Sequence, residues 1–542
     1  MLIFPHSNSL LDYKQDMRRH QTSTVVFLLV CPGLCGTYAT RAETTPSPDH
    51  RYLFITDEHI RHIHQLERVV NQPSKLSDNP VIKPEHPWES RYVHHAGTVT
   101  YDEQEGFFKY WYTSGTDPNV ELTYEGGSYP RGASVVCYAT SQDGIHWKKP
   151  NLGQVQCDDS RDNNILKLGK YSPQGVAVLD DPKDPDPQQR YKAIYWDHVP
   201  MKLREQGIGG DLDGTWVAFS PDGIHWKDYQ HNPVLRGYND CDLCIVQDPL
   251  SSRYLAYGRF GFNRTVACTT SSDFLNWSTP RQVLEPDRQE LSGPWPLTQF
   301  YGMTVDMYEG LYLGCLKIYR PGSDGRIDSQ LAASHDGVHW QRVGNRQTFL
   351  PLGAPNQRDD GMVRTAQHYI TRGNQLYLYY GMVSGPHAGA LYPDKTIQRR
   401  WPNAIGLALL RRDGFVSLDA KEQRGSLLTK PIMLDGRQLH LNVNVEAGGE
   451  ARVVLCNPWA SLEDFYATRE NDIPQYGQPG HNDYNHDDDG RVLISQASEP
   501  ITGDHVDVVV KFPDTSLARL AGKVAALRIE LSKAKLYSFY FK

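Results

Sequence analysis

The sequence has only one long hydrophobic run, and that scarcity limits what the chain can be. The run covers residues 24–34 and is too short to cross a lipid bilayer as a helix. No comparable run follows it in the 542-residue chain. We therefore expect no membrane span.

No part of the sequence concentrates charge of one sign. The chain has 56 Lys and Arg residues and 64 Asp and Glu residues, so its net charge is a mild −8. It has neither an acidic tail nor the clustered positive charge with which proteins bind nucleic acid. No nucleic-acid partner is expected.

Cysteine is sparse, with nine residues in the chain, and shows no complete metal-binding pattern. Cys241 and Cys244 have the spacing of half a zinc site, but no second Cys or His pair with zinc spacing follows. We therefore expect no metal and no cofactor. Buried thiols are common at apolar strand positions. Three cysteines occupy such positions: Cys137, Cys268 and Cys315.

The first 42 residues have the order of a secretory signal. A basic segment begins at Met17, the apolar run follows, and Ala39 and Ala42 are small residues that suit cleavage. We predict a signal peptide with an upstream extension over residues 1–42. The mature protein is then expected to be secreted or periplasmic.

Residues 43–76 are predicted to be a spacer that contains one short amphipathic helix. The predicted helix covers residues 57–70, where apolar side chains recur at helical spacing. These side chains are Ile60, Ile63, Leu66 and Val69.

What the sequence does contain is a repeated motif, Ser-x-Asp-Gly-x-His-Trp. It begins at Ser141, Ser220 and Ser334, a variant begins at Ser271, and an eroded copy occupies residues 412–415. A unit that returns at intervals of about 50–80 residues marks a propeller or another array. We call each copy of this motif a box. In each box, Asp-Gly predicts a tight turn in which the Asp side chain accepts hydrogen bonds from backbone N–H groups and Gly takes a positive φ. The Trp is expected to pack between neighbouring sheets.

Each box ends a run of short segments with alternating apolar residues, many of them aromatic. Such runs, bounded by Gly, Pro and Asp, predict strands, and four strands per repeated unit describe a β-propeller. We count five units over residues 77–420. Residues 78–83 echo residues 231–236, which predicts that this early strand completes the last blade and closes the ring. Residues 421–542 lack the boxes but keep short alternating runs, which favours a β-sandwich. The predicted fold is therefore all-β, a five-bladed β-propeller followed by a C-terminal β-sandwich.

The loops that enter the blades are expected to meet at one end of the central channel, where side chains from distant parts of the sequence converge. Two carboxyl groups across a glycosidic bond are what its hydrolysis requires. We predict Glu89, Asp240 and Asp360 as the catalytic carboxylates. Substrate-binding roles are predicted for His95, Asp242, Arg259, Arg320, Asp359 and His387. Asp242 and Asp359 are also the adjacent alternatives to the predicted catalytic aspartates, because a shift of one residue reverses the direction of a strand side chain.

Two structural interpretations compete with this prediction. The acids can cap turns or pair with surface arginines, as Asp and Glu residues commonly do. The 31 Tyr and 11 Trp residues suit strand packing as well as stacking on pyranose rings.

This layout resembles the five-bladed propeller glycoside hydrolases, the superfamily of arabinanases, xylosidases, fructosidases and anhydrogalactosidases. The resemblance covers residues 77–418, and the C-terminal sandwich is similar to that of the fructosidase branch. The chain departs from the family at the first blade, where residues 94–99 replace a Trp-Met-Asn-Asp-Pro-Asn-Gly motif. It departs again at residues 178–182, which lack Arg-Asp-Pro. The resemblance implies a secreted glycoside hydrolase with a carbohydrate substrate and a carboxylate pair at the channel mouth.

Two alternatives remain open at this point. A non-catalytic carbohydrate-binding propeller would keep its function without the carboxylates. A sialidase-like enzyme would need six blades and three arginines around a carboxylate, whereas five blades are counted here.

Overall fold

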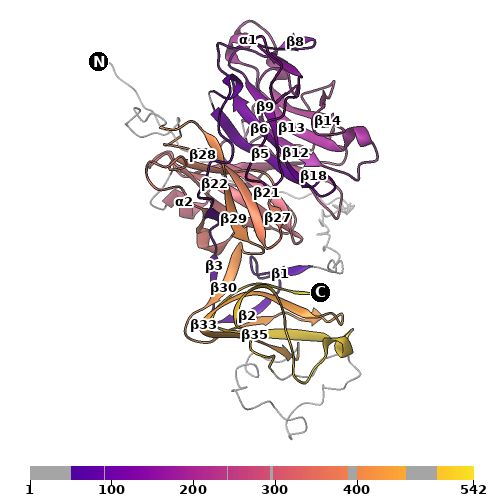
Figure 1. Cartoon of the computed structure of the whole chain (residues 1–542), viewed down its shortest axis with the longest axis vertical. Coiled ribbons are helices and arrows are strands. Elements are labelled where there is room, and N and C mark those ends of the chain that lie inside the picture. The colour runs from indigo at the N-terminus through magenta and orange to yellow at the C-terminus, as the bar shows by residue number, and fades with distance from the viewer. Residues whose placement is uncertain (1–49, 91, 241, 293–296, 388–399, 459–496) are drawn as a thin grey trace, which may run out of the picture. The chain divides into compact units, whose positions relative to one another are not determined.

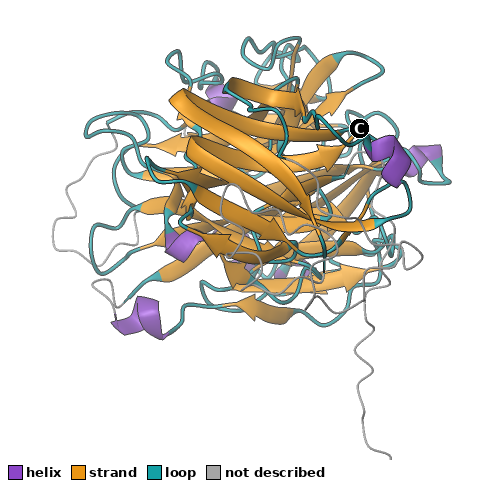
Figure 2. Ribbon diagram, turned by 90° about the horizontal axis from the view of Figure 1, so that it is seen from below, coloured by secondary structure: helices purple, strands orange, loops and turns teal. Residues whose placement is uncertain are grey.

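The computed structural model describes residues 50–90, 92–240, 242–292, 297–387, 400–458 and 497–542 (Figure 1). Strands make up most of this part of the chain, and its helices are short (Figure 2). The predicted signal peptide lies outside the described residues. Among the described residues, no helix is long and apolar enough to cross a membrane.

Five blades of antiparallel strands follow one another along the chain, and one parallel pair between Ile327 and Met362 joins blades 4 and 5 into a single ten-stranded sheet. Blade 1 is β5 (Tyr92–Asp102), β6 (Phe107–Gly115), β9 (Ser134–Ser141) and β11 (Ile165–Leu166). Blade 2 is β12 (Pro173–Asp180), β13 (Tyr191–Asp197), β14 (Gly214–Ser220), β15 (Lys227–Asp228) and β16 (Leu235–Arg236). Blade 3 is β17 (Cys244–Gln247), β18 (Tyr254–Gly258), β19 (Val266–Ser271) and β20 (Arg281–Leu284). Blade 4 is β21 (Gln299–Tyr308), β22 (Leu311–Tyr319), β23 (Ile327–Ser334), β24 (Gln341–Arg342) and β25 (Thr348–Leu350). Blade 5 is β26 (Met362–Thr365), β27 (Ile370–Arg372), β28 (Gln375–Val383), β29 (Ala404–Arg411) and β4 (Ser74–Lys75).

The described chain thus forms five blades, as the sequence predicts, and not the six that the sialidase-like alternative needed. Other elements decorate the connections between the blade strands. These are η1 (Pro87–Glu89), β7 (Leu122–Tyr124), β8 (Gly127–Ser128), β10 (Val155–Cys157), η2 (Pro187–Gln189), α1 (Met201–Glu205), η3 (Gly210–Leu212), α2 (Arg288–Ser292) and η4 (Gly344–Arg346).

The N-terminal segment closes the ring, as predicted, but its strand is β4, which lies just before the predicted residues 78–83. β4 pairs with β29, the third strand of blade 5, and Ile82 forms a bridge with Ile405. The predicted equivalence with blade 2 extends to side chains. The Asn79 amide accepts from the Leu407 N–H and donates to its carbonyl, and the Asn232 amide makes the same two bonds with Val217.

The boxes form the predicted turns. Asp222 Oδ1 accepts hydrogen bonds from the backbone N–H groups of Ile224 and His225, each at 2.8 Å, and Gly223 has a φ of 76°. The box turns also join blades, since the Gly223 carbonyl accepts a 2.6 Å hydrogen bond from Trp111 Nε1 of blade 1. In the same way, Tyr379 of blade 5 donates to the Gly144 carbonyl and Tyr257 of blade 3 donates to the Gly337 carbonyl.

Two residues that follow β26 tie the five inner strands together. The Gln367 backbone N–H donates to the Gly97 carbonyl of blade 1, and its side-chain amide bonds both the N–H and the carbonyl of Ile245 in blade 3. His368 Nδ1 lies 3.2 Å from Asp306 of blade 4 and the ring also bonds the backbone of Val178 in blade 2. These contacts fix the inner strands of all five blades against one another.

The predicted helix over residues 57–70 is wrong. The segment forms two strands, β2 (Ile60–His64) and β3 (Glu67–Val70), on either side of Gln65, which has a φ of 51°. β2 pairs with β31 (Gly425–Thr429) and β3 pairs with β30 (Val416–Ala420). The apolar residues that recur every three positions therefore belong to two strands separated by a turn, and not to a helix.

The C-terminal sheet is built on two long strands, β33 (Leu439–Cys456) and β35 (Val524–Phe541). Their pairing is broken between Val445 and Glu450, so each half of a long strand takes different neighbours. The first half of β35 pairs with β31 and β32 (Ile432–Met433), and the second half pairs with β30 and β1 (Arg51–Leu53). β34 (Gly503–Val509) pairs with β33, and η6 (Leu517–Leu520) precedes β35. The two halves enclose one apolar core.

The cysteines of the blades are buried thiols, as predicted. Cys137, Cys268 and Cys315 lie on blade strands, and burial raises the pKa of each thiol. Cys241, half of the weak zinc pattern, lies outside the described residues.

Candidate functional site

One end of the propeller carries the loops that enter each blade and the connections between its second and third strands. Exposed apolar side chains are concentrated on these connections. Tyr238 is 56% exposed, Trp401 is 39% exposed and Phe262 is 36% exposed. Met201, Ile208, Leu291 and Leu297 are exposed on the same set of connections. We call this end of the ring the loop face.

A chain of contacts on the loop face starts at Asp240, in the loop that enters blade 3. Its side chain is 18% exposed and forms an ion pair with Arg259, which follows β18. Arg259 Nη2 donates a 2.7 Å hydrogen bond to the Tyr301 carbonyl on β21, and its guanidinium lies 4.7 Å from the centre of the Tyr301 ring. The Tyr301 hydroxyl lies 3.1 Å from His387 Nε2. Three residues predicted from the sequence, Asp240, Arg259 and His387, are therefore linked through Tyr301.

Asp242 lies beside this chain of contacts. Its carboxylate is 3.3 Å from Lys317 Nζ on β22, and both side chains are nearly buried. The Asp242 side chain packs directly on Gly302, the neighbour of Tyr301, where a Cβ atom would lie 2.8 Å from it. Gly302 thus makes room for the carboxylate.

Two further arginines surround the same tyrosine. The guanidinium of Arg264 lies 5.8 Å from the Tyr301 ring centre and 5.0 Å from that of Tyr319, and the guanidinium of Arg364 lies 5.7 Å from Tyr301. Arg264 Nη1 also donates to Gln299 at 3.0 Å. We call Asp240, Asp242, Arg259, Arg264, Tyr301, Lys317, Tyr319, Arg364 and His387 the Tyr301 cluster.

Sequence reasoning missed Tyr301, Lys317 and Arg364. Two of them carried a readable signal. Lys317 and Arg364 are charged residues inside otherwise apolar strands, and both are almost fully buried. A buried charge needs partners, so a charge within a core strand marks a polar site.

Asp360 and Asp359 both enter blade 5 at the loop face but have different surroundings. Asp360 accepts 2.8 Å hydrogen bonds from the backbone N–H groups of Asn356 and Gly385, and Gly385 lies two residues before His387. Asp359 is buried and accepts from Lys75 Nζ of β4 and from the Tyr380 hydroxyl. Asp360 therefore supports the loop that carries His387, while Asp359 supports the closure of the ring.

Glu89 is fully buried in blade 1. Its carboxylate lies 2.9 Å from Lys149 Nζ and accepts a 2.8 Å hydrogen bond from the Tyr112 hydroxyl. The backbone N–H of Glu85 adds a third bond. No contact between Glu89 and the Tyr301 cluster is seen among the described residues, and this geometry favours a structural role.

The two remaining predicted residues are Arg320 and His95. Arg320 donates a 2.6 Å hydrogen bond to Asp328, and burial raises the pKa of that carboxyl although Arg320 opposes the shift. The loop after Arg320 reaches the site through Gly325, whose carbonyl accepts from the His387 N–H. His95 lies on β5, and its side chain is outside the described part of the structure.

The loop face of blade 2 adjoins Asp240. Burial and the neighbouring Arg204 lower the pKa of His198, while Asp240 acts in the opposite direction. The exposed Tyr238 ring packs edge-on against Trp196, with ring centres 5.0 Å apart. An exposed aromatic ring, that of Tyr238, therefore lies two residues before Asp240 in the loop that enters blade 3.

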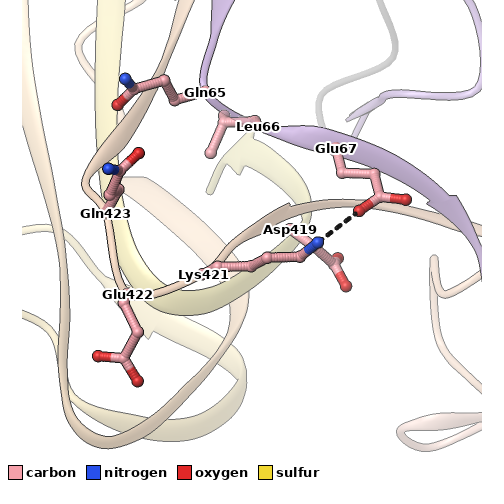
Figure 3. Close-up of a pocket in the computed structure, with 7 residues that line it drawn as sticks. All are labelled: Gln65, Leu66, Glu67, Asp419, Lys421, Glu422 and Gln423. Carbon is pink, nitrogen blue, oxygen red and sulfur yellow. Dashed lines mark ion pairs between the residues drawn. The ribbon is translucent and has the colours of Figure 1, made fainter.

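A surface pocket of about 420 Å³ lies elsewhere, against β3 and the end of β30 (Figure 3). Its polar lining includes Glu67 and Lys421, which form a 3.3 Å ion pair. None of the predicted site residues lines it. In the part of the chain that the structure describes, no group of three or more His, Cys, Asp or Glu side chains could hold a metal ion.

No protein-family model matches the chain, and no curated protein matches its sequence. Solved structures with a similar backbone exist at low identity. One is β-1,2-mannobiose phosphorylase from Listeria innocua, with 14% identity, 62% of this chain and 96% of that chain covered, and a TM-score of 0.41. Another belongs to the GH130 family of mannoside phosphorylases, which contains glycoside hydrolases, with 15% identity, coverage of 63% and 94%, and a TM-score of 0.37.

A third similar structure is the fructofuranosidase of Schwanniomyces occidentalis. It shares 11% identity, with 86% of this chain and 98% of that chain covered and a TM-score of 0.37. These three similar structures are a phosphorylase, a member of a phosphorylase family that contains glycoside hydrolases, and a fructofuranosidase, all at low identity. Since all three TM-scores are below 0.5, the fold assignment rests on the chain's own strand pairing.

Proposed function

We propose that this protein is a secreted glycoside hydrolase whose substrate lies on the loop face against the Tyr301 cluster. The observation that carries the proposal is the position of Asp240. It is a partly exposed carboxylate joined through Arg259 and Tyr301 to His387, and aromatic rings are exposed on the surrounding connections.

The exposed rings suit a carbohydrate ligand. Tyr238, Phe262 and Trp401 all present aromatic surface on the loop face. A large flat ring offers apolar area to a pyranose face, while a tyrosine hydroxyl or indole N–H remains available for hydrogen bonding. The proposed substrate is therefore an oligosaccharide or polysaccharide that lies across these rings.

Asp240 would act at the reacting carbon, as a base toward water or as a nucleophile. An adjacent guanidinium favours the charged form of a carboxylate, and ionisation is what either role requires. Arg259 would therefore keep Asp240 ionised while the Tyr301 carbonyl holds the guanidinium in place. The second carboxyl group of the reaction is proposed to be Asp242 or Asp360, with Asp242 nearer in sequence.

A second candidate function has its own support. Glu89, Asp359 and Asp360 are all engaged in structural hydrogen bonds. A carbohydrate-binding propeller without catalysis would need only the aromatic rings and polar groups of the loop face. Turnover distinguishes the two functions, because a binding protein retains its activity when a carboxylate is neutralised.

The test is hydrolysis of a panel of polysaccharides and aryl glycosides, read as the release of reducing ends. We expect release from at least one member, and its loss in Asp240→Asn. Asp159→Asn is the matched control, since Asp159 is exposed on a blade 1 loop. Binding of a glycan without release by the wild-type protein would establish the second candidate instead.

A further inference from the structure

We propose that the substrate carries a carboxylate, as uronic-acid sugars do, and that Arg264 binds it. This inference rests on the proposed function and names the class of sugar that the loop face accepts.

Arg264 is held in place without a carboxylate partner among the described residues. Its guanidinium lies over the rings of Tyr319 and Tyr301, and Nη1 donates to the Gln299 side chain. Its Nε is buried and has no hydrogen-bond partner in the part of the chain that the structure describes. No salt bridge to Arg264 is formed anywhere in the described part of the chain, whereas Arg259 pairs with Asp240. A fixed guanidinium that keeps its full charge matches the planar fork of a carboxylate.

The formal charge of the whole Tyr301 cluster is positive, like that of Arg264. Among the described residues, the cluster has four permanent cations and two carboxylates. The cations are Arg259, Arg264, Lys317 and Arg364, and the carboxylates are Asp240 and Asp242. An excess of positive charge in a partly buried site attracts an anionic ligand and penalises a cationic one.

The turn that carries Arg264 also explains why the anion is proposed to belong to a sugar. Phe262 lies two residues before Arg264, is 36% exposed, and is fixed by a 2.8 Å hydrogen bond from its N–H to the Arg259 carbonyl. One short turn thus carries both an exposed aromatic ring and the arginine whose guanidinium lies over Tyr301 and Tyr319. A uronic acid has the two matching parts, a pyranose face for the ring and a carboxylate for the arginine.

The experiment compares each acidic oligosaccharide with its own methyl ester, which has the same sugar but no charge. Oligosaccharides from pectate, alginate and glucuronoxylan serve as probes, and both dissociation constants and cleavage rates are measured. A charge-assisted contact predicts a preference for the acid of roughly tenfold or more in affinity. In the Arg264→Gln variant, the affinity for the acid should be close to the affinity for the ester, so that their ratio is about one. Arg281→Gln, at an exposed arginine on β20, should leave the ratio unchanged, and thermal midpoints check that both variants fold.

The outcomes separate this inference from the proposed function. Cleavage of neutral glycans with no preference for any acid overturns the role of Arg264 and leaves the hydrolase intact. Tight binding of an acid without cleavage, lost in Arg264→Gln, supports the role of Arg264 and overturns the hydrolase. Arg264-dependent stabilisation by inorganic phosphate, without a preference for acidic glycans, overturns the sugar-borne carboxylate. Failure to bind or cleave any glycan overturns both proposals.

Discussion

The hydroxyl of Tyr301 lies 3.1 Å from Nε2 of His387, and the two residues come from different blades. Tyr301 is near the start of the inner strand of blade 4, while His387 follows the second strand of blade 5. The contact therefore couples the geometry of the site to the packing of the two blades.

Tyr301→Phe removes the hydroxyl but keeps the ring that the arginines surround. We expect the thermal midpoint to change little, because one hydrogen bond contributes about 1 kcal/mol. Turnover should fall on the order of tenfold, since the orientation of His387 is no longer fixed. Tyr229→Phe is the matched control, because Tyr229 also packs edge-on against a histidine, His231, in blade 2. Equal turnover in both variants would contradict a functional role for the Tyr301–His387 contact.

Glu89→Gln distinguishes a structural carboxylate from a catalytic one. The change removes the buried counter-charge of the Lys149 ammonium and leaves it only the more exposed Glu85, so the cost in stability is at most about 3 kcal/mol. We expect a clearly lower thermal midpoint and an unchanged kcat in the folded enzyme at low temperature. A kcat lower by a factor of about 100 in a folded variant would instead restore Glu89 as the general acid predicted from the sequence.

Gln367→Leu tests the contacts that join the inner strands. The substitution leaves the buried N–H and carbonyl of Ile245 without the side-chain amide that bonds both. Each unsatisfied group costs about 1–3 kcal/mol, so a large fall in the thermal midpoint is expected. Gln375→Leu, at an exposed position on β28, is the control and should shift the midpoint little. A stable Gln367→Leu protein would show that the ring does not depend on this residue.

The box turns predict a loss of stability in acid. Burial by itself would raise the pKa of Asp222, Asp273 and Asp336, but hydrogen bonds within each turn lower it to about 2. Their ordinary pKa is 3.8, so the folded state binds fewer protons than the unfolded state between these values. The stabilisation is complete above about pH 4 and is lost as the pH falls toward 2.

Thermal midpoints measured between pH 6 and pH 2 check this prediction. Asp222→Asn keeps an oxygen that can accept the two backbone bonds but removes the titrating group. Its midpoint should fall less steeply with acid than that of the wild-type protein. An equally steep fall would place the acid sensitivity in other carboxylates.

The repeat made the ring predictable, because its signals are local. The Asp-Gly boxes specify their own turns through hydrogen bonds within a few residues, and the echo of Asn232 in Asn79 identified the closing strand. The helix prediction failed because a three-residue spacing does not reveal the strand partners, β31 and β30, which lie far along the chain.

The site was only partly predictable, for a related reason. Loop position identified Asp240, but it could not show that Lys149 reaches Glu89 across 60 residues of sequence. Nor could it show that Tyr301 and Arg364 leave their strands toward the same group of side chains as Arg259. These relationships depend on how blades 3, 4 and 5 pack, which no local pattern encodes.

The most direct test of the account is the effect of Asp240→Asn on turnover and on ligand affinity, measured with the same glycan. We predict that kcat falls by a factor of about 100 to 10,000 while the dissociation constant changes little. Asp240→Glu serves as the conservative variant and should recover part of kcat, which excludes a simple loss of folding through Arg259. A kcat that is unchanged in a folded Asp240→Asn protein would contradict the assignment of Asp240 as the reacting carboxylate.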